Sequence, residues 1–140
     1  MKKVVLSLVA VFMLFAVSAQ AQVFKLSLWG DICVPNEDYT GGLEIGIGSQ
    51  TQAVDGVQWG IIYSYAGTLR GVQLGFVNNT DNGTGVQWGF VNYADTAKGL
   101  QLGFVNWANN MNGGVQIGLV NVIKNKPNFL PVFVIFNFGF

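Results

Sequence analysis

Few side chains in this sequence have the chemistry of a catalytic or metal-binding site. The chain contains no histidine, which excludes Ser-His and Cys-His nucleophile pairs and imidazole metal ligands. The one concentration of carboxylates is Glu37-Asp38, with Asp31 nearby. Carboxylate oxygens suit Ca²⁺, but this run lacks the ligand spacing of a calcium loop, so a solvated turn is the favoured interpretation. We therefore expect no enzyme activity, no cofactor and no metal.

Basic side chains in the segments between apolar stretches are a more specific signal. They are Arg70, Lys98, Lys124 and Lys126. If these segments share one side of the molecule, the four side chains are expected to contact phosphates of outer-leaflet glycolipid. The alternative is that they only keep exposed loops soluble. Residues 22–140 hold five basic residues against seven acidic ones, a formal charge of −2, which gives no support to nucleic-acid binding.

The elements that carry these side chains are copies of one short unit. The unit reads G-V-Q-L-G-F-V-N at residues 71–78, and its copies begin 14 or 15 residues apart. Close copies begin at Gly85, Gly99 and Gly114, and looser copies begin at Gly42 and Gly56. A fixed period of this kind indicates that one structural unit is reused along the chain.

Each copy is expected to form a β-strand. Two glycines per unit would each cost about 1 kcal/mol in a helix interior. The other residues are mostly β-branched or aromatic and favour strands. Val72, Leu74 and Phe76 alternate with polar or small neighbours, which is the period of a strand. The segments 24–28 and 132–140 alternate in the same way, so about eight strands are expected in total.

Two all-β folds fit this pattern. One is a small antiparallel up-and-down β-barrel of about eight strands, and the other is a β-solenoid of 14–15-residue coils in which identical amides stack into ladders. The connecting segments alternate, because 66–70 resembles 94–98 whereas 80–84 and 109–113 are rich in Asn and Gly. Successive turns of an antiparallel sheet lie at opposite ends, while the coils of a solenoid are equivalent. The alternation therefore predicts the barrel.

The first 21 residues are expected to be a secretory signal peptide. A basic start is followed by an apolar run over residues 4–17 and by the small-residue cleavage pattern at 19–21. Residues 22–140 then form a single repeat-built β domain. Only 10% of the chain is charged, against about 25% in typical soluble domains, which favours a surface that faces lipid. The expected location is the bacterial outer membrane, and the alternative is the cell surface or secretion.

The Gly-x-Gln-x-Gly-x-x-Asn units over residues 42–121 resemble the short surface-repeat proteins of several diderm bacterial groups. The end of the chain resembles the terminal strand signal of outer-membrane barrels, and its alternating aromatics are Phe136, Phe138 and Phe140. This second resemblance implies an assembly signal, with outer-membrane lipids and the barrel-assembly machinery as partners. The first implies exposure at the bacterial surface, and it carries no activity with it.

The expected function is therefore that of a non-enzymatic outer-membrane or surface protein with a structural, adhesion or interaction role. Eight strands leave a bore that side chains fill, so no open pore is expected. The alternative is a secreted or surface-attached β-solenoid that acts as a binding or adhesion surface. The sequence identifies no protein ligand, oligomeric state or role for Cys33.

Overall fold

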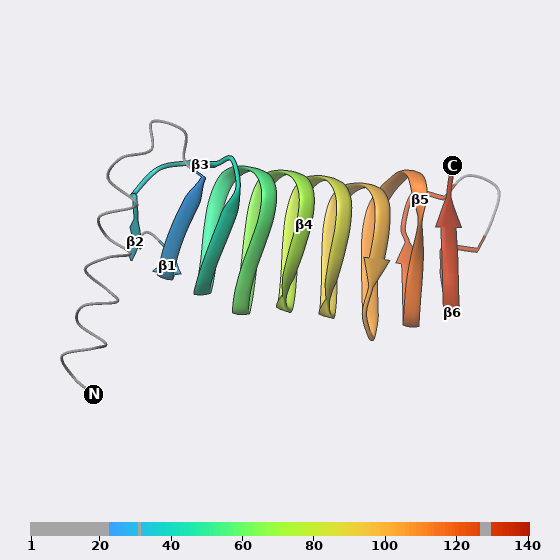
Figure 1. The fold of residues 1–140 in the computed structure, drawn as a ribbon. Helices are drawn as coiled ribbons and strands as arrows, with labels where there is room; N and C mark the ends of the chain where they lie inside the picture. The colour runs from blue at the N-terminus through green and yellow to red at the C-terminus, as the bar shows by residue number, and fades with distance from the viewer. Residues whose placement is uncertain (1–22, 31, 127–129) are drawn as a thin grey trace.

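The described part of the chain winds into a β-solenoid of about six turns (Figure 1). The computed structural model describes residues 23–30, 32–126 and 130–140. Its strands are β1 (Phe24–Gly30), β2 (Ile32–Val34), β3 (Tyr39–Thr40), β4 (Leu43–Leu102), β5 (Val105–Ile123) and β6 (Val132–Gly139). The 60-residue strand β4 is extended throughout and turns back beside itself coil after coil.

Parallel pairing between coils shows that the barrel prediction is wrong. Strand β4 pairs in parallel with β5, from Val91↔Val105 to Leu102↔Ile117. Strand β1 also pairs in parallel with β4, and so does β3. An up-and-down barrel requires antiparallel neighbours, whereas an offset of 14 or 15 residues brings the same position of each unit into one stack. The all-β class was predicted correctly, and the solenoid alternative describes its architecture.

The linker alternation that favoured the barrel does not recur in the side chains that point into the coils. One inner row is filled by Leu69, Gly83, Ala97 and Met111, and Ala97 pairs directly with Met111. Three of these four are buried, and they differ widely in size. From coil to coil the row runs large, small, small, large, so residue size does not alternate between the two kinds of linker. The linker rhythm therefore does not mark a reversal of chain direction, because the coils pair in parallel.

Both ends of the solenoid are closed by strands that run against the coil direction. At the N-terminal end β2 pairs antiparallel with β1, and at the C-terminal end β6 pairs antiparallel with β5. In Figure 1 β6 stands beside the last coil as a separate straight strand. Strands β1 and β6 lie where the sequence predicted the two terminal strands. Such atypical ends stop the stacking of identical coils. Repeat proteins need capping ends of this kind for solubility.

The interior of the coils is built on a column of glutamine side chains. The column consists of Gln58, Gln73, Gln87, Gln101 and Gln116, and all are buried. From Gln73 onward, each Nε2 donates to the Oε1 of the glutamine one coil earlier, over 2.7–2.9 Å. The same Nε2 donates to a backbone carbonyl across its own coil, as Gln87 does to Tyr93 over 3.1 Å. Each amide thus links two coils and ties together the two sides of one coil.

A second column of asparagines runs beside the first with the opposite polarity. Asn78 Nδ2 donates to Asn92 Oδ1, Asn92 donates to Asn106, and Asn106 donates to Asn121, over 2.8–2.9 Å. These NH₂ groups point toward the C-terminal coil, whereas those of the glutamines point toward the N-terminal coil. The dipoles of the two columns therefore oppose each other. Ser64 takes the place of asparagine one coil earlier and donates to the carbonyl of Leu74 over 3.0 Å.

The two glycines of each unit allow the coils to approach this closely. Gly85 has φ +132°, and a Cβ on it would overlap the backbone carbonyl of Gly71. A Cβ on Gly89 would overlap the carbonyl of Gly75 and lie 2.5 Å from Asn78 Nδ2. The first glycine is therefore required both by its positive φ and by its contact with the neighbouring backbone. The second glycine leaves space for the asparagine column.

The glutamine column begins on a buried carboxylate. Glu44 occupies the glutamine position of its coil, is fully buried, and accepts a hydrogen bond from Gln58 Nε2 over 3.3 Å. It also accepts hydrogen bonds from the hydroxyls of Ser27 and Thr51, over 2.9 and 2.7 Å. Lys25, only 2% exposed, donates to Thr51 Oγ1 over 2.8 Å. A hydroxyl therefore bridges two buried opposite charges at the N-terminal end.

Removing one amide from the column should destabilise the protein strongly. Gln87→Leu leaves Gln73 Oε1 and the Tyr93 carbonyl buried without their donor, and deprives Gln101 of its acceptor. We expect a loss of at least about 2 kcal/mol in the free energy of unfolding, measured by urea denaturation. The matched control is Gln52→Leu at an exposed position, which should change stability little. Equal losses for the two variants would contradict a structural role for the column.

The buried charges at the N-terminal end should be coupled. Glu44→Gln preserves shape but leaves the Lys25 ammonium buried without an opposite charge, so we expect a loss of about 3–5 kcal/mol. Lys25→Met combined with Glu44→Gln should recover most of that loss. A double-mutant cycle of unfolding free energies measures the coupling. If Glu44→Gln lowered the free energy of unfolding equally in the wild type and in the Lys25→Met variant, the charge-balancing role of Lys25 would be excluded.

Candidate interaction surface

An apolar groove runs across successive coils on the outside of the solenoid, with a volume of about 790 Å³. One wall is formed by the fourth position of the units, with Trp59, Leu74, Trp88 and Ile117. The other wall is formed by the sixth position, with Ile61, Phe76, Phe90, Phe104 and Leu119. The floor between the walls is formed by the glycines of the fifth position, Gly75, Gly89, Gly103 and Gly118. We call this feature the apolar groove.

The strand period explains why these apolar side chains point outward. Glutamine at the third position of each unit points into the coil, so the fourth position must point away from it. Phe76 and Phe90 stack with ring centroids 4.9 Å apart, and Phe90 and Phe104 with centroids 4.3 Å apart. These distances match the spacing of neighbouring strands. The three rings are nevertheless 42–56% exposed, so stacking leaves much of their surface in solvent.

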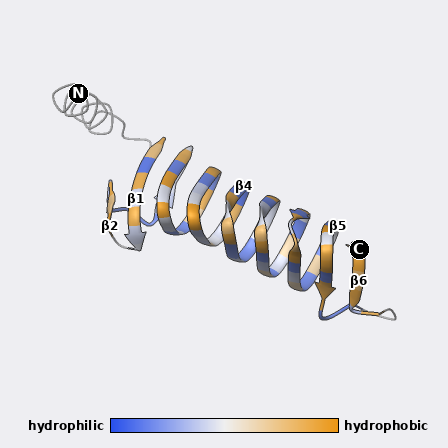
Figure 2. Ribbon diagram, turned by 90° about the horizontal axis from the view of Figure 1, so that it is seen from below, coloured by the Kyte–Doolittle hydropathy of each residue, from blue (hydrophilic) through white to orange (hydrophobic). Residues whose placement is uncertain are grey.

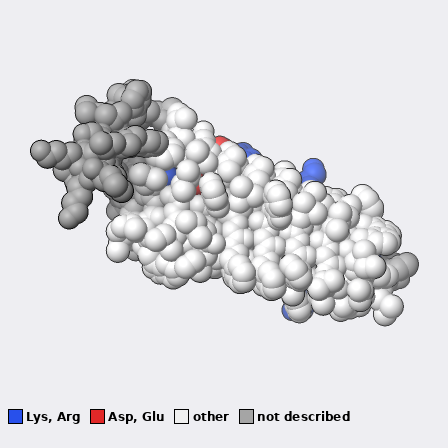
Figure 3. All heavy atoms as spheres, turned by 60° about the horizontal axis from the view of Figure 1, so that its bottom comes forward, with Lys and Arg blue, Asp and Glu red and all other residues white. Residues whose placement is uncertain are grey.

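The apolar groove contains no charged residue. In Figure 2 the hydrophobic segments recur from turn to turn along the ribbon. Figure 3 shows that a broad face of the molecule carries almost no Lys, Arg, Asp or Glu atoms, and that the charged atoms lie mainly along one margin. Soluble proteins rarely expose large continuous apolar patches unless the patch binds something.

The C-terminal strand contributes one residue to the apolar groove. Ile135 of β6 lies in the groove lining and has φ +74°, a conformation that β-branched residues rarely adopt. The register between β5 and β6 shifts at this point, between Gly118 and Asn121. Strain of this kind persists only where the surrounding structure imposes it. Here it adds an apolar side chain at the end of the groove.

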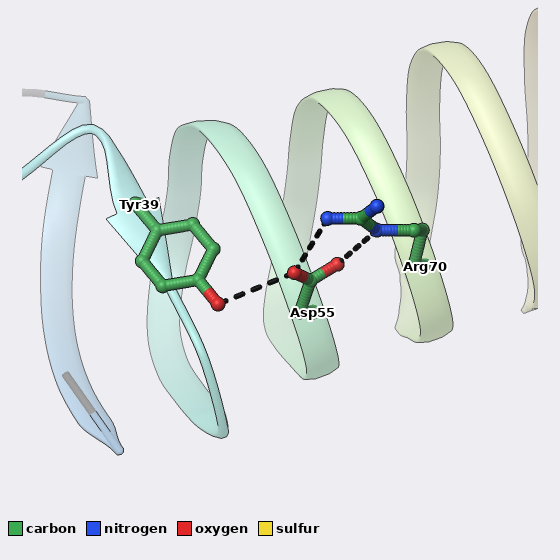
Figure 4. Close-up of polar contacts among 3 residues, drawn as sticks. All are labelled: Tyr39, Asp55 and Arg70. Carbon is green, nitrogen blue, oxygen red and sulfur yellow. Dashed lines mark hydrogen bonds and ion pairs between the residues drawn. The ribbon is translucent and has the colours of Figure 1, made fainter. Parts of the chain in front are cut away.

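Polar side chains link neighbouring coils elsewhere on the surface. Arg70 donates from Nη2 to Asp55 Oδ2 over 2.7 Å and also donates from Nε to Asp55 Oδ1. Tyr39 donates its hydroxyl to Asp55 over 3.2 Å, so Asp55 lies between partners from two neighbouring turns (Figure 4). The Arg70 guanidinium lowers the pKa of Asp55. Partial desolvation and the Asp55 carboxylate raise the pKa of Tyr39.

Similar contacts recur further along the solenoid. The hydroxyl of Tyr65 donates to Asp81 over 2.8 Å, and this hydrogen bond raises the pKa of Tyr65. Asn109 donates to the hydroxyl of Tyr93 over 3.0 Å and to Asp95 over 2.7 Å. These surface contacts join consecutive coils but create no cluster of reactive groups.

The four basic residues proposed as lipid contacts lie in different environments. Arg70 pairs with Asp55, and Lys98 and Lys124 are exposed. Lys126 donates to Asn137 Oδ1 over 2.8 Å and lies over the rings of Phe133 and Phe138, where desolvation lowers its pKa. Without a barrel wall, the reason for placing all four at one membrane boundary is lost. Their contact with lipid phosphates stays a prediction.

Two of the terminal aromatics lie on the capping strand β6, and Phe140 follows it directly. Phe136 and Phe138 are exposed, while Asn137 and Gly139 between and beyond them are buried. Phe140 is 89% exposed, and its ring lies 5.9 Å from that of Phe138. The predicted alternation is therefore present, but it belongs to a strand that closes a solenoid. A role as an assembly signal stays a prediction.

The described residues contain no group of three or more His, Cys, Asp and Glu side chains that could hold a metal ion. Asp31 of the acidic segment lies outside the described residues, as does the expected signal peptide. Within the described ranges, no helix has both the length and the hydropathy to span a bilayer. No protein-family model, curated protein or solved structure matches this chain.

The sequence pattern identified the residues of the apolar groove but assigned them the wrong environment. Leu74 and Phe76 were expected on the apolar face of a strand, in a barrel whose surface faces lipid. The signal for the correct fold was the identity of the amides, because Gln and Asn recur in the four close copies of the unit. Lys25 was expected on an ordinary polar strand face, and no sequence signal marked its burial.

The ion pair between Asp55 and Arg70 should make a small contribution to stability that acid removes. Because the pKa of Asp55 is lowered by folding, the contribution is present at neutral pH and is lost as the pH falls below about 4. Asp55→Asn should therefore be less stable than the wild type at pH 7 and nearly equal to it at about pH 2. Melting temperatures across this range measure the difference. The difference in melting temperature should be much smaller in an Arg70→Gln background, where only the weaker hydrogen bond from Tyr39 to Asp55 remains. An undiminished difference there would contradict an origin in the ion pair.

Proposed function

We propose that this chain is an exported, non-enzymatic β-solenoid that acts as a binding or adhesion surface, either attached to the cell surface or secreted. The observation that carries the proposal is the apolar groove, which is exposed, uncharged and continuous over successive coils. Its residues contribute little to the interior, which is formed by amides, hydroxyls and small side chains. A binding role accounts for their exposure.

The rigidity of the coils supports this role. Each glutamine and asparagine of the two columns is fixed by hydrogen bonds to its own coil or the next one. The outer rows are attached to this framework at a constant spacing. A surface held in one geometry loses little conformational freedom on binding, and this increases affinity.

The non-enzymatic part of the proposal is based on side-chain chemistry. The sequence lacks histidine, and the polar contacts on the described surface join two or three side chains without a nucleophile next to a base. Export is inferred from the basic start, apolar run and small-residue cleavage pattern of residues 1–21.

The proposal predicts that cells exporting this protein bind apolar surfaces through the groove. The full-length chain would be expressed in a diderm bacterium, and cell binding to phenyl-coated beads would be counted. Phe76→Asp combined with Phe90→Asp should lower binding by about tenfold or more, because it removes exposed apolar area and adds charge. Protease treatment of intact cells and a carbonate wash of the membranes would locate the protein.

Trp107→Asp is the matched control. Trp107 is 38% exposed, similar to Phe90 at 42%, but it is not part of the groove lining. This variant should bind beads like the wild type. Retention of the full-length chain in the cytoplasm would refute export. Equal bead binding by the groove variant and the wild type would refute the adhesion role.

A further inference from the structure

We propose that the apolar groove binds a second copy of this chain, face to face. This inference rests on the proposed function and identifies the partner that the surface takes. The sixth-position row of each copy would enter the groove of the other copy, so that the same surface is used on both sides. Such an isologous contact closes into a two-fold dimer and does not propagate.

The exposed area is sufficient for a stable dimer. Apart from Leu74, which is less exposed, the wall residues are about half exposed, from 42% for Phe90 to 64% for Trp88. With about 150–250 Å² per large side chain, the two walls expose on the order of 1,000 Å² of apolar surface per copy. Stable protein interfaces bury about 800 Å² per partner. Covering most of the apolar groove would therefore reach the size of a specific dimer.

The shape of the surface also favours another copy. The walls are rows of side chains that repeat at the spacing of stacked strands, about 4.8 Å. The floor between them consists of glycines, so the groove is open to a row of side chains inserted from outside. A second solenoid presents a row with the same spacing, and the two rows can interdigitate as in paired β-sheets. Few other surfaces offer this match.

The lack of charged residues in the apolar groove also favours a second copy as the partner. No lining residue is charged, so the apolar groove offers no cation to an anionic lipid headgroup. A second copy brings an equally uncharged surface, and the contact would bury no unpaired charge. Among the described residues that line the groove, only Trp59 and Trp88 carry a polar side-chain atom, the indole nitrogen.

The symmetry makes a specific prediction about contacts. In a two-fold dimer with antiparallel axes, the middle coil lies opposite itself, so Phe90 lies beside Phe90 of the other copy. The end coils are exchanged, so Ile61 of one copy lies near Leu119 of the other. A parallel arrangement would instead place every coil beside its own equivalent.

Sedimentation velocity on protein produced from the full-length chain tests self-association. We expect a monomer–dimer equilibrium with mostly dimer at about 10 μM. Phe90→Asp should raise the dissociation constant at least about tenfold, and Trp107→Asp should leave it unchanged. A wild-type protein that stays monomeric at about 100 μM would overturn the proposal. A monomer that binds phosphatidylglycerol vesicles through Phe90 would assign the apolar groove to lipid instead.

Cross-linking tests the arrangement. In a Cys33→Ser background, Phe90→Cys should form a covalent dimer with a short bis-maleimide. Ile61→Cys and Leu119→Cys should each remain monomeric alone but cross-link when mixed. Circular dichroism of each variant confirms that it is folded. Efficient dimerisation of Ile61→Cys by itself would exclude the antiparallel two-fold dimer.

The two proposals fail in different ways. A monomeric wild type whose groove variant still loses bead binding would overturn the second copy as partner and leave the adhesion role standing. The opposite result is a protein that dimerises through the groove while cells exporting it bind beads no better than cells exporting the groove variant. That result would overturn the adhesion role and leave the dimer standing.

Discussion

The structure depends on the pairing of buried amides between neighbouring coils. A buried NH₂ group that lacks an acceptor costs as much as or more than a hydrogen bond contributes. Gln87 meets this requirement through the identical residue directly beside it in the previous coil and through a backbone carbonyl of its own coil. That condition fixes a parallel register of 14 or 15 residues. It also brings the backbones so close that glycine is needed at Gly85 and Gly89.

An amide interior reverses the usual distribution of polarity. In most domains the apolar face of a strand is covered by the core. Here the face with Gln73 is inside, and the face with Leu74 and Phe76 is left outside. The narrow coil has no room for the amides and the large apolar side chains together. Exposed aromatic rows are thus a direct consequence of the amide columns, and a solenoid of this type carries a binding surface unless another molecule covers it.

The sequence allowed the strands and their period to be predicted, because alternation is a local property. It did not allow the neighbour of each strand to be predicted from the linkers. Ala97 and Met111 looked like parts of two kinds of turn, yet the two residues pair with each other and are buried in one cluster. Identity of the amides was the better guide, since antiparallel strands do not require it. The burial of Lys25 depends on Thr51 and Glu44, which only the folded coil brings together.

The direction of the amide columns also explains how the ends are built. In the glutamine column every donor points toward the N-terminal end, so the first position must supply an acceptor, and the Glu44 carboxylate does so. The last position then keeps an unused acceptor, which is Gln116 Oε1. The asparagine column runs the other way and leaves its unused acceptor at Asn78 Oδ1. In the described residues both columns thus end on a carbonyl oxygen, and an unpaired carbonyl is tolerated more readily than an unpaired N–H. The carboxylate of Glu44 therefore meets a need set by column polarity, and Lys25 balances its charge.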